Sequence, residues 1–283
     1  MKFHFIAAEN AYFPVSKLCQ VLGVSRGGFY AWKRRPASAR RQEDERLKVL
    51  VKEAHVQGRQ KYGSPRIHHA LKKQAVRISR KRVIRLMQEE GIVGAVRRRY
   101  RCTTNSQHDM PVAANLLDRQ FRADGPNQRW VGDTTELVTP SGKLYLAAVV
   151  DLYSRFVVGW AISAMNNRHL AMKALDMALK RRCPEIGLLH HSDRGSTYAS
   201  EDYQALLDKH GRTCSMSRRG NCYDNAAMES WFPTFKSECG EKFESAADAK
   251  AKAFDYIEVF YNQHRMHSAI GYAAPAEFER AAA

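Results

Sequence analysis

The stretch RWVGDTTELVTPSGKLYLAAVVDLYSRFVVGWAIS, residues 129–163, is the strongest indication of the fold of this 283-residue chain. It contains three runs rich in β-branched and aromatic residues, separated by the turn-forming segments SGK and YSR. Short runs of this kind with turns between them predict an antiparallel meander of three strands.

The segments that follow alternate between helical and strand-like patterns. Helical patterns occur at residues 169–183, 200–211 and 224–236. Patterns that predict strands occur at residues 186–193 and 213–217. The whole order predicts an α/β fold with a mixed five-stranded sheet and flanking helices, which is the order of the ribonuclease-H-like fold.

The charge of the chain is distributed unevenly. Residues 1–120 hold 26 Lys and Arg against 9 Asp and Glu, so the entire net charge of +17 lies there, and the remainder is neutral. A basic part joined to a neutral one favours binding of a polyanion, above all nucleic acid. The alternative is a basic surface kept for solubility.

The basic part has two helical patterns. In FPVSKLCQVLGVSRGGFYAW, residues 13–32, two short helices surround Gly23, and Ser25 is a natural N-cap for the second. This predicts a helix-turn-helix with Arg26 and Lys33 exposed, although a plain helical hairpin fits as well. In residues 62–92, Ser79 caps a second helix with a cationic face that includes Arg80 and Arg82.

These patterns divide the chain into four parts. We expect a helix-turn-helix-like segment at 1–36, a second helical DNA-binding region at 37–100, a linker at 101–124, and an α/β core with a helical tail at 125–283. The six cysteines form no CxxC pair, so we expect neither disulfides nor structural zinc. No run of 18 apolar residues and no signal sequence is found, and we expect a cytoplasmic protein without a membrane span.

Three carboxylates occupy notable positions in the core. Asp133 lies within the first strand, where a buried aspartate needs a partner or a metal. Asp193 ends a strand at the edge where α/β sheets place ligands. On the helix at 224–236, Glu229 shares a face with Asn225 and Lys236, opposite an apolar face. We expect Asp224 to cap this helix, and Pro233 to kink it by freeing the carbonyl of Glu229.

Two strand aspartates and a helix glutamate can surround a pair of divalent cations such as Mg²⁺ or Mn²⁺. Fifty-nine residues separate Asp133 from Asp193, and 35 separate Asp193 from Glu229. With Lys236 seven residues further on, this spacing resembles the D,D(35)E signature of retroviral integrases and insertion-sequence transposases. The motifs DTTEL, HSDRGSTYAS, SRRGNCYDNAAMESWF and YNQHRMHSAIGYAAPAEF resemble those of the OrfB transposases of the insertion-sequence-three family.

This resemblance covers nearly the whole chain and implies a DNA transposase with a ribonuclease-H-like integrase core. It implies strand cleavage and strand transfer with two Mg²⁺ or Mn²⁺ ions, held by Asp133, Asp193 and Glu229. It also implies binding to transposon ends and target DNA, a homo-oligomer on DNA, and an OrfA partner or frameshift fusion. The candidate DNA contacts are Arg26, Lys33, Arg80, Arg82, Arg194, Asn225 and Lys236.

Other readings stay open at this point. Asp151 is a possible fourth carboxylate, and His190 and His191 beside Asp193 either move a proton or only pack. In the tail, Tyr261, Asn262, Arg265 and His267 either touch DNA or pin the last helix. For the whole chain, the alternatives to a transposase are a DNA-binding regulator with an inert core and a ribonuclease-H-like nuclease.

Overall fold

The computed structural model describes residues 1–95, 112–218 and 221–282. At the N-terminus the helix-turn-helix pattern is present, because Gly23 adopts φ +61° between two helices and Ser25 Oγ accepts the N–H of Gly28 at 3.0 Å. A preceding helix, which the sequence did not indicate, packs Ile6 against Cys19 and Phe29. The three helices are α1 (Lys2–Glu9), α2 (Val15–Val21) and α3 (Arg26–Arg34).

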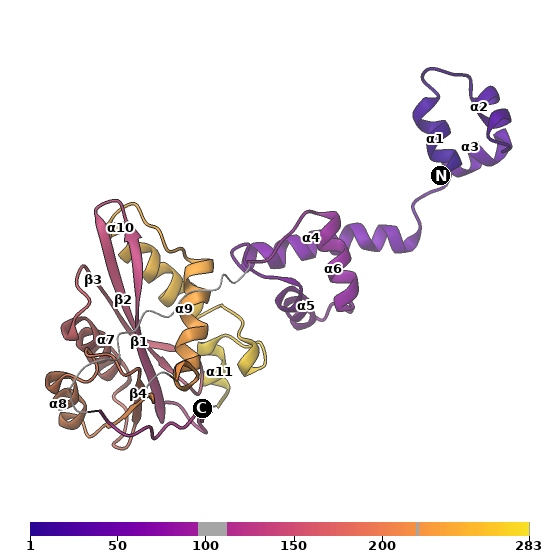
Figure 1. Cartoon of the computed structure of the whole chain (residues 1–283). Coiled ribbons are helices and arrows are strands. Elements are labelled where there is room, and N and C mark those ends of the chain that lie inside the picture. The colour runs from indigo at the N-terminus through magenta and orange to yellow at the C-terminus, as the bar shows by residue number, and fades with distance from the viewer. Residues whose placement is uncertain (96–111, 219–220, 283) are drawn as a thin grey trace.

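The second helical unit follows directly and stands between α1–α3 and the rest of the chain (Figure 1). Its core is built from apolar side chains at helical spacing, such as Leu47, Ile67 and Leu86, each at most 1% exposed. Ser79 caps its last helix by accepting the N–H of Arg82, as the sequence predicted. The helices are α4 (Ala39–Gln57), α5 (Ser64–Lys73) and α6 (Arg80–Glu89). Of the expected linker at 101–124, residues 101–111 lie outside the described residues.

The α/β part contains the mixed five-stranded sheet that the sequence predicted. Its strand order is β3-β2-β1-β4-β5, in which β1, β2 and β3 pair antiparallel, while β4 and β5 run parallel to β1. Between β1 and β4 the register pairs Gly132 with Ser192. The strands are β1 (Arg129–Thr139), β2 (Gly142–Asp151), β3 (Val157–Ser163), β4 (Leu189–Ser192) and β5 (Thr213–Met216).

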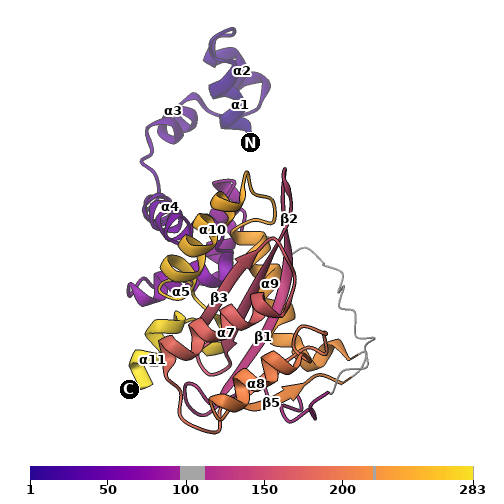
Figure 2. The ribbon, with the colours of Figure 1, turned by 90° about the vertical axis from the view of Figure 1, so that its left-hand side faces the viewer.

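Both faces of the sheet are buried, because neighbouring side chains on each strand point to opposite sides. On β2, Ala147 and Val149 join one apolar cluster, and Leu146 and Ala148 join the other. Helices α7 (Arg168–Arg182) and α8 (Glu201–Lys209) cover the first face, and α9 (Ala226–Glu238) and α10 (Ala246–Phe254) cover the second (Figure 2). Gly159 is required on β3, since a Cβ there would lie 2.1 Å from the carbonyl oxygen of Ala174 on α7.

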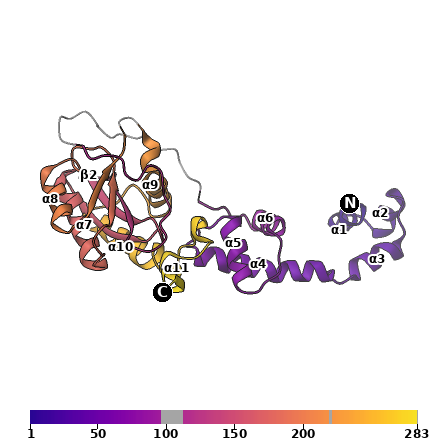
Figure 3. The same cartoon turned by 90° about the horizontal axis from the view of Figure 1, so that it is seen from below.

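The chain ends in a tail that packs against both the core and the second helical unit (Figure 3). The side chain of Asn262 is fully buried and both accepts from and donates to the backbone of Val157. Arg265, 1% exposed, pairs with Glu238 at the end of α9. These contacts show the tail pinned onto the core. Its elements are a π-helical turn (Asp255–Tyr261), a short 3₁₀ turn (Ser268–Ile270) and α11 (Pro275–Ala282).

The tail also joins the second helical unit to the core. The Tyr62 hydroxyl donates to the carbonyl of His264 and accepts the N–H of Met266, at 3.2 and 2.9 Å. The rings of His69 and Tyr272 stack with their centroids 3.8 Å apart. No helix in the described ranges 1–95, 112–218 and 221–282 is long and apolar enough to cross a membrane.

Candidate active site

Two of the predicted carboxylates come from neighbouring parallel strands. Because Gly132 pairs with Ser192, the next residues, Asp133 within β1 and Asp193 just after β4, are neighbours where β4 ends. Asp133 Oδ1 accepts the N–H of Thr134 at 2.7 Å, and Asp193 Oδ1 accepts the N–H of Gly195 at 3.0 Å. Backbone donors therefore orient both aspartates from rigid elements.

The third carboxylate, Glu229, lies in the first turn of α9 on its exposed side. The opposite side of the helix buries Met228, Trp231 and Phe235 against the sheet, as the helical spacing predicted. Helix α9 continues across Pro233 to Glu238. The Thr234 hydroxyl donates to the carbonyl of Ser230 in the same stretch, at 2.9 Å.

The charges of two of the carboxylates act on the third. Burial, and after it the charges of Asp193 and Glu229, raise the pKa of Asp133 well above its usual range, against the hydrogen bond from the Thr134 N–H. Partial burial raises the pKa of Glu229. A buried carboxylate with negatively charged neighbours, such as Asp133, favours a bound proton or cation, since like charges oppose ionisation.

The chemistry of the site fits a hard divalent cation. Its donors are carboxylate oxygens, which Mg²⁺ and Mn²⁺ prefer. Asn225 Nδ2 donates to Asp133 Oδ2 at 3.1 Å, while Asn225 Oδ1 is buried and has no partner among the described residues. Within the same described residues, no three Asp, Glu, His or Cys side chains stand close enough to form a finished metal cluster. The donor set is present, but it is not drawn together.

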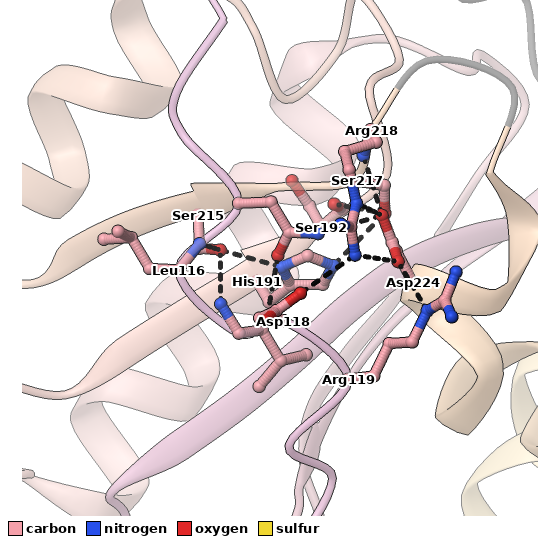
Figure 4. Close-up of polar contacts among 11 residues, drawn as sticks. Leu116, Asp118, Arg119, His191, Ser192, Ser215, Ser217, Arg218 and Asp224 are labelled. Atoms are coloured by element: carbon pink, nitrogen blue, oxygen red, sulfur yellow. Dashed lines mark hydrogen bonds and ion pairs between the residues drawn. The ribbon is translucent and has the colours of Figure 1, made fainter.

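Asp224 has a different role from the one its position suggested. We expected it to cap α9, but the residue before the helix is Asn225, and Asp224 lies in the preceding 3₁₀ turn (Cys222–Asn225). Its side chain is fully buried and accepts hydrogen bonds from Arg218 and Arg119 (Figure 4). It also accepts one from the side chain of Asn115. The carboxylate of Asp224 is bound by two guanidinium groups and does not cap a helix. The prediction that Asp224 caps α9 was wrong.

This cluster attaches the segment before the core to the loop before α9. The guanidinium and the backbone N–H of Arg218 both donate hydrogen bonds to Asp224, and they hold its pKa well below its usual range. The side chain of Arg119 adds to this effect. Nearby, Ser215 Oγ accepts the N–H groups of Leu116 and Leu117. The network therefore holds the chain that leads to Glu229. Sequence reasoning missed it because the two segments that it joins, 115–119 and 215–224, lie about a hundred residues apart.

The two histidines beside Asp193 are buried and hydrogen-bonded within the sheet. Burial lowers the pKa of His190 to about 3 and that of His191 to about 4, so both rings are neutral at pH 7. His191 contacts Ser215 and Ser217 at 2.9 and 3.1 Å, and His190 contacts the Tyr203 hydroxyl at 3.2 Å. This geometry favours the packing role over proton transfer.

Asp151 stands apart from the site, at the far end of β2. It pairs in register with Trp130 rather than with Asp133, and its carboxylate accepts the N–H groups of Asn127 and Tyr153 at 2.7 and 2.8 Å. Burial raises its pKa to about 6. The carboxylate of Asp151 is therefore held by the backbone N–H groups of Asn127 and Tyr153, and not by the side chains of its neighbours Ser154 and Arg155.

The candidate DNA contacts are spread over the chain. Arg26 and Lys33 are exposed on α3, and Arg80 is exposed at the start of α6. Arg82 forms ion pairs with Asp44 and Glu43. Arg194 and Lys236 are half-buried near the carboxylates and at the end of α9, and Asn225 contacts Asp133. Their roles toward DNA stay predictions.

Known families match the second helical unit and the α/β part. A family described as an integrase core domain matches residues 123–222, and a second one with the same description matches residues 210–275. A family described as an HTH-like domain matches residues 42–100, which contain α4–α6.

Similar proteins extend over the full chain. It is 41% identical over 283 residues to the transposase InsF of insertion sequence IS3A from Escherichia coli, covering 99% of this chain and 98% of that one. It is 44% identical over 263 residues to an uncharacterised 31 kDa protein of insertion element IS600 from Shigella sonnei, covering 92% and 97%. Among solved structures, the catalytic core domain of HTLV-2 integrase in complex with magnesium is 18% identical with a TM-score of 0.41, covering 56% and 98%.

Proposed function

The chain belongs to the insertion-sequence-three family of DNA transposases, and on that premise we propose that Asp133, Asp193 and Glu229 form its catalytic site. The observation that carries the proposal is geometric: the register of the two parallel strands sets Asp133 next to Asp193, and Glu229 lies on the exposed side of the first turn of α9. The charges of Asp193 and Glu229 both contribute to the raised pKa of Asp133.

The three side chains would hold divalent Mg²⁺ or Mn²⁺, and two ions is the number that the family resemblance implies. When bound, such ions activate an attacking oxygen and stabilise a leaving oxygen in phosphodiester displacement. That chemistry fits donor cleavage, with water as nucleophile, and strand transfer, with a DNA 3′-hydroxyl as nucleophile.

The protein supplies the positions of these groups. The N–H groups of Thr134 and Gly195 each fix one oxygen of an aspartate, and Asn225 holds the other oxygen of Asp133. The apolar side of α9 anchors the helix that presents Glu229. Such preorganisation matters because displacement requires the reacting groups to be held in line.

DNA binding would involve both helical units. The DNA contacts that we propose are Arg26 and Lys33 on α3, Arg80 and Arg82 on α6, and Arg194, Asn225 and Lys236 near the carboxylates. On the same family premise, we propose that the protein works as an oligomer on DNA, with an OrfA partner or as a fusion to it.

A strand-joining assay tests the catalytic proposal. The full chain is incubated with labelled duplex that carries the ends of the element, with target DNA, and with Mg²⁺ or Mn²⁺. Glu229→Gln should lower joining at least about a hundredfold, since it removes a metal ligand, while binding of the duplex stays unchanged.

Glu201→Gln, the same change at an exposed position on α8, is the matched control and should join normally. A Glu229→Gln variant that joins DNA at the parent rate would overturn the site assignment. DNA binding without chemistry in the parent would favour a regulator with an inert core.

A further inference from the structure

A crevice lies between the second helical unit and the α/β core. It has a volume of about 670 Å³. One wall comes from the loop between α4 and α5 and from the chain after α6, and the other comes from the end of α9 and the loop after it. The wall residues used below are Lys61, Gly94, Lys236, Gly240, Glu241 and Lys242.

Backbone contacts fix both walls. On the helical side, the N–H of Ala95 donates to the carbonyl of Lys61 at 3.0 Å. Gly94 packs so closely on Gly63 that a Cβ at position 94 would lie 2.7 Å from its Cα. The segment that carries Lys61 is therefore held against the chain after α6.

On the catalytic side, the loop after α9 is tied to β1. The N–H of Val138 donates to the carbonyl of Glu241 at 2.8 Å, and the N–H of Phe243 donates to the carbonyl of Val138 at 2.9 Å. Gly240 turns the loop with φ +126°, which other residues rarely adopt. Lys242 is therefore presented from a fixed loop.

The crevice is positively charged. Three lysines, Lys61, Lys236 and Lys242, line it together with one carboxylate, that of Glu241. Lys61 and Lys236 are half-buried, and Lys242 is exposed. A polar, cationic crevice of this kind suits a backbone of phosphates better than an apolar partner.

Its position relative to the carboxylates is set by α9. Lys236 follows Glu229 by seven residues, which is close to two turns and places both on one side of the helix. At 1.5 Å per residue the two are about 10 Å apart along the axis. At 3.4 Å per nucleotide along one strand, that distance corresponds to about three nucleotides.

We propose that this crevice binds backbone phosphates of the DNA strand that reacts at the carboxylates, about three nucleotides from the reacting phosphate. Lys61 and Lys242 are its phosphate contacts beside Lys236. The inference rests on the proposed function, since it takes Glu229 as the place where the strand reacts. Because one lysine belongs to the helical unit and the other to the core, a single strand would contact both.

The salt dependence of DNA binding tests this directly. The full chain is titrated onto a fluorescent duplex that carries the end of the element, and onto a scrambled duplex, from 50 to 300 mM KCl. The slope of log K against log salt concentration is negative, and each phosphate contact adds about 0.9 to its magnitude. Slopes are compared by their magnitude here. Lys61→Gln and Lys242→Gln should each lower the slope by about 0.9, and the double variant by about 1.8, on both duplexes alike.

Three controls complete the experiment. Lys61→Arg and Lys242→Arg keep the charge and should keep the parent slope. Lys209→Gln, an exposed lysine on α8 over the opposite face of the sheet, should also leave the slope unchanged. Unfolding midpoints that match the parent show that each variant is folded.

The possible results distinguish a failure of the proposed phosphate binding from a failure of the proposed catalytic site. A folded double variant with the parent slope would overturn the proposal that the crevice binds phosphates, even if the parent protein joins DNA. A lowered slope supports the crevice, even if the parent fails to join DNA with Mn²⁺, a result that would count against the catalytic proposal alone.

Discussion

The ion pair between Glu238 and Arg265 provides the sharpest test of how α9 is anchored. Glu238 ends the helix that carries Glu229, and Arg265 belongs to the tail. Their side chains are 4% and 2% exposed, and two hydrogen bonds of 2.7 Å join the guanidinium to the carboxylate. The Tyr256 hydroxyl donates to the same carboxylate at 2.9 Å. Glu238→Gln keeps this shape but removes the charge.

The expected cost follows from burial. Breaking a buried pair by removing one partner costs about 3–5 kcal/mol, since the other charge is left without compensation. Glutamine keeps one acceptor oxygen, so we expect about 3 kcal/mol for Glu238→Gln. For a domain of this size, that corresponds to an unfolding midpoint about 6–12 °C lower.

Urea unfolding followed by tryptophan fluorescence and circular dichroism measures the change. Asp176→Asn is the matched control, because it breaks the pair with Lys180, whose two side chains are 75% and 46% exposed, and should cost less than about 0.5 kcal/mol. Replacing both partners, Glu238→Leu with Arg265→Met, should recover most of the loss. A Glu238→Gln variant within about 1 kcal/mol of the parent would mean that the buried ion pair does not anchor α9.

Three more predictions follow from single residues. Pro233→Ser should raise stability by up to about 3 kcal/mol, since it restores an N–H toward the carbonyl of Glu229, without changing the Mn²⁺ concentration needed for joining; joining by the serine variant alone would mean that Pro233 has inactivated this protein. Because the pKa of Asp151 is raised from 3.8 to about 6 in the folded state, its stabilising contribution is present below pH 3.8 and is lost as pH rises through 6. The unfolding free energy of the parent should therefore fall by about 3 kcal/mol relative to Asp151→Asn between pH 4 and 7, and a constant difference would contradict this. Asp224→Asn should cost about 2 kcal/mol and slow joining about tenfold, because the charge that holds Arg218 is lost; joining at the parent rate would exclude a positioning role.

The sheet and most helices were predictable because their signals are local. Alternation along residues 129–163 and helical spacing in α4–α9 reflect which side chains are buried, and burial shapes each segment on its own. Helix α1 was missed because Phe3 and Phe5 alternate as they would in a strand, while Ile6 makes the buried contact.

The interactions between distant segments were not predictable in this way. Asp224 looked like a helix cap because its sequence position fits one, but Arg119, far earlier in the chain, competes for its carboxylate. The contact of Tyr62 with the tail spans about two hundred residues, and no pattern within either segment indicates it. The positions of the carboxylates were inferred from spacing and family resemblance, and the structure adds the strand register that makes Asp133 and Asp193 neighbours and the backbone donors that orient them.

The most direct test of the central claim is metal binding by the full chain. A ligand at 100 times its Kd raises the free energy of unfolding by about 2.7 kcal/mol, so Mn²⁺ should raise the unfolding midpoint of the parent protein. Asp193→Asn and Glu229→Gln should lose most of this rise, whereas Asp208→Asn, at an exposed position on α8, should keep it. An equal rise in all four proteins would contradict a metal site formed by Asp133, Asp193 and Glu229.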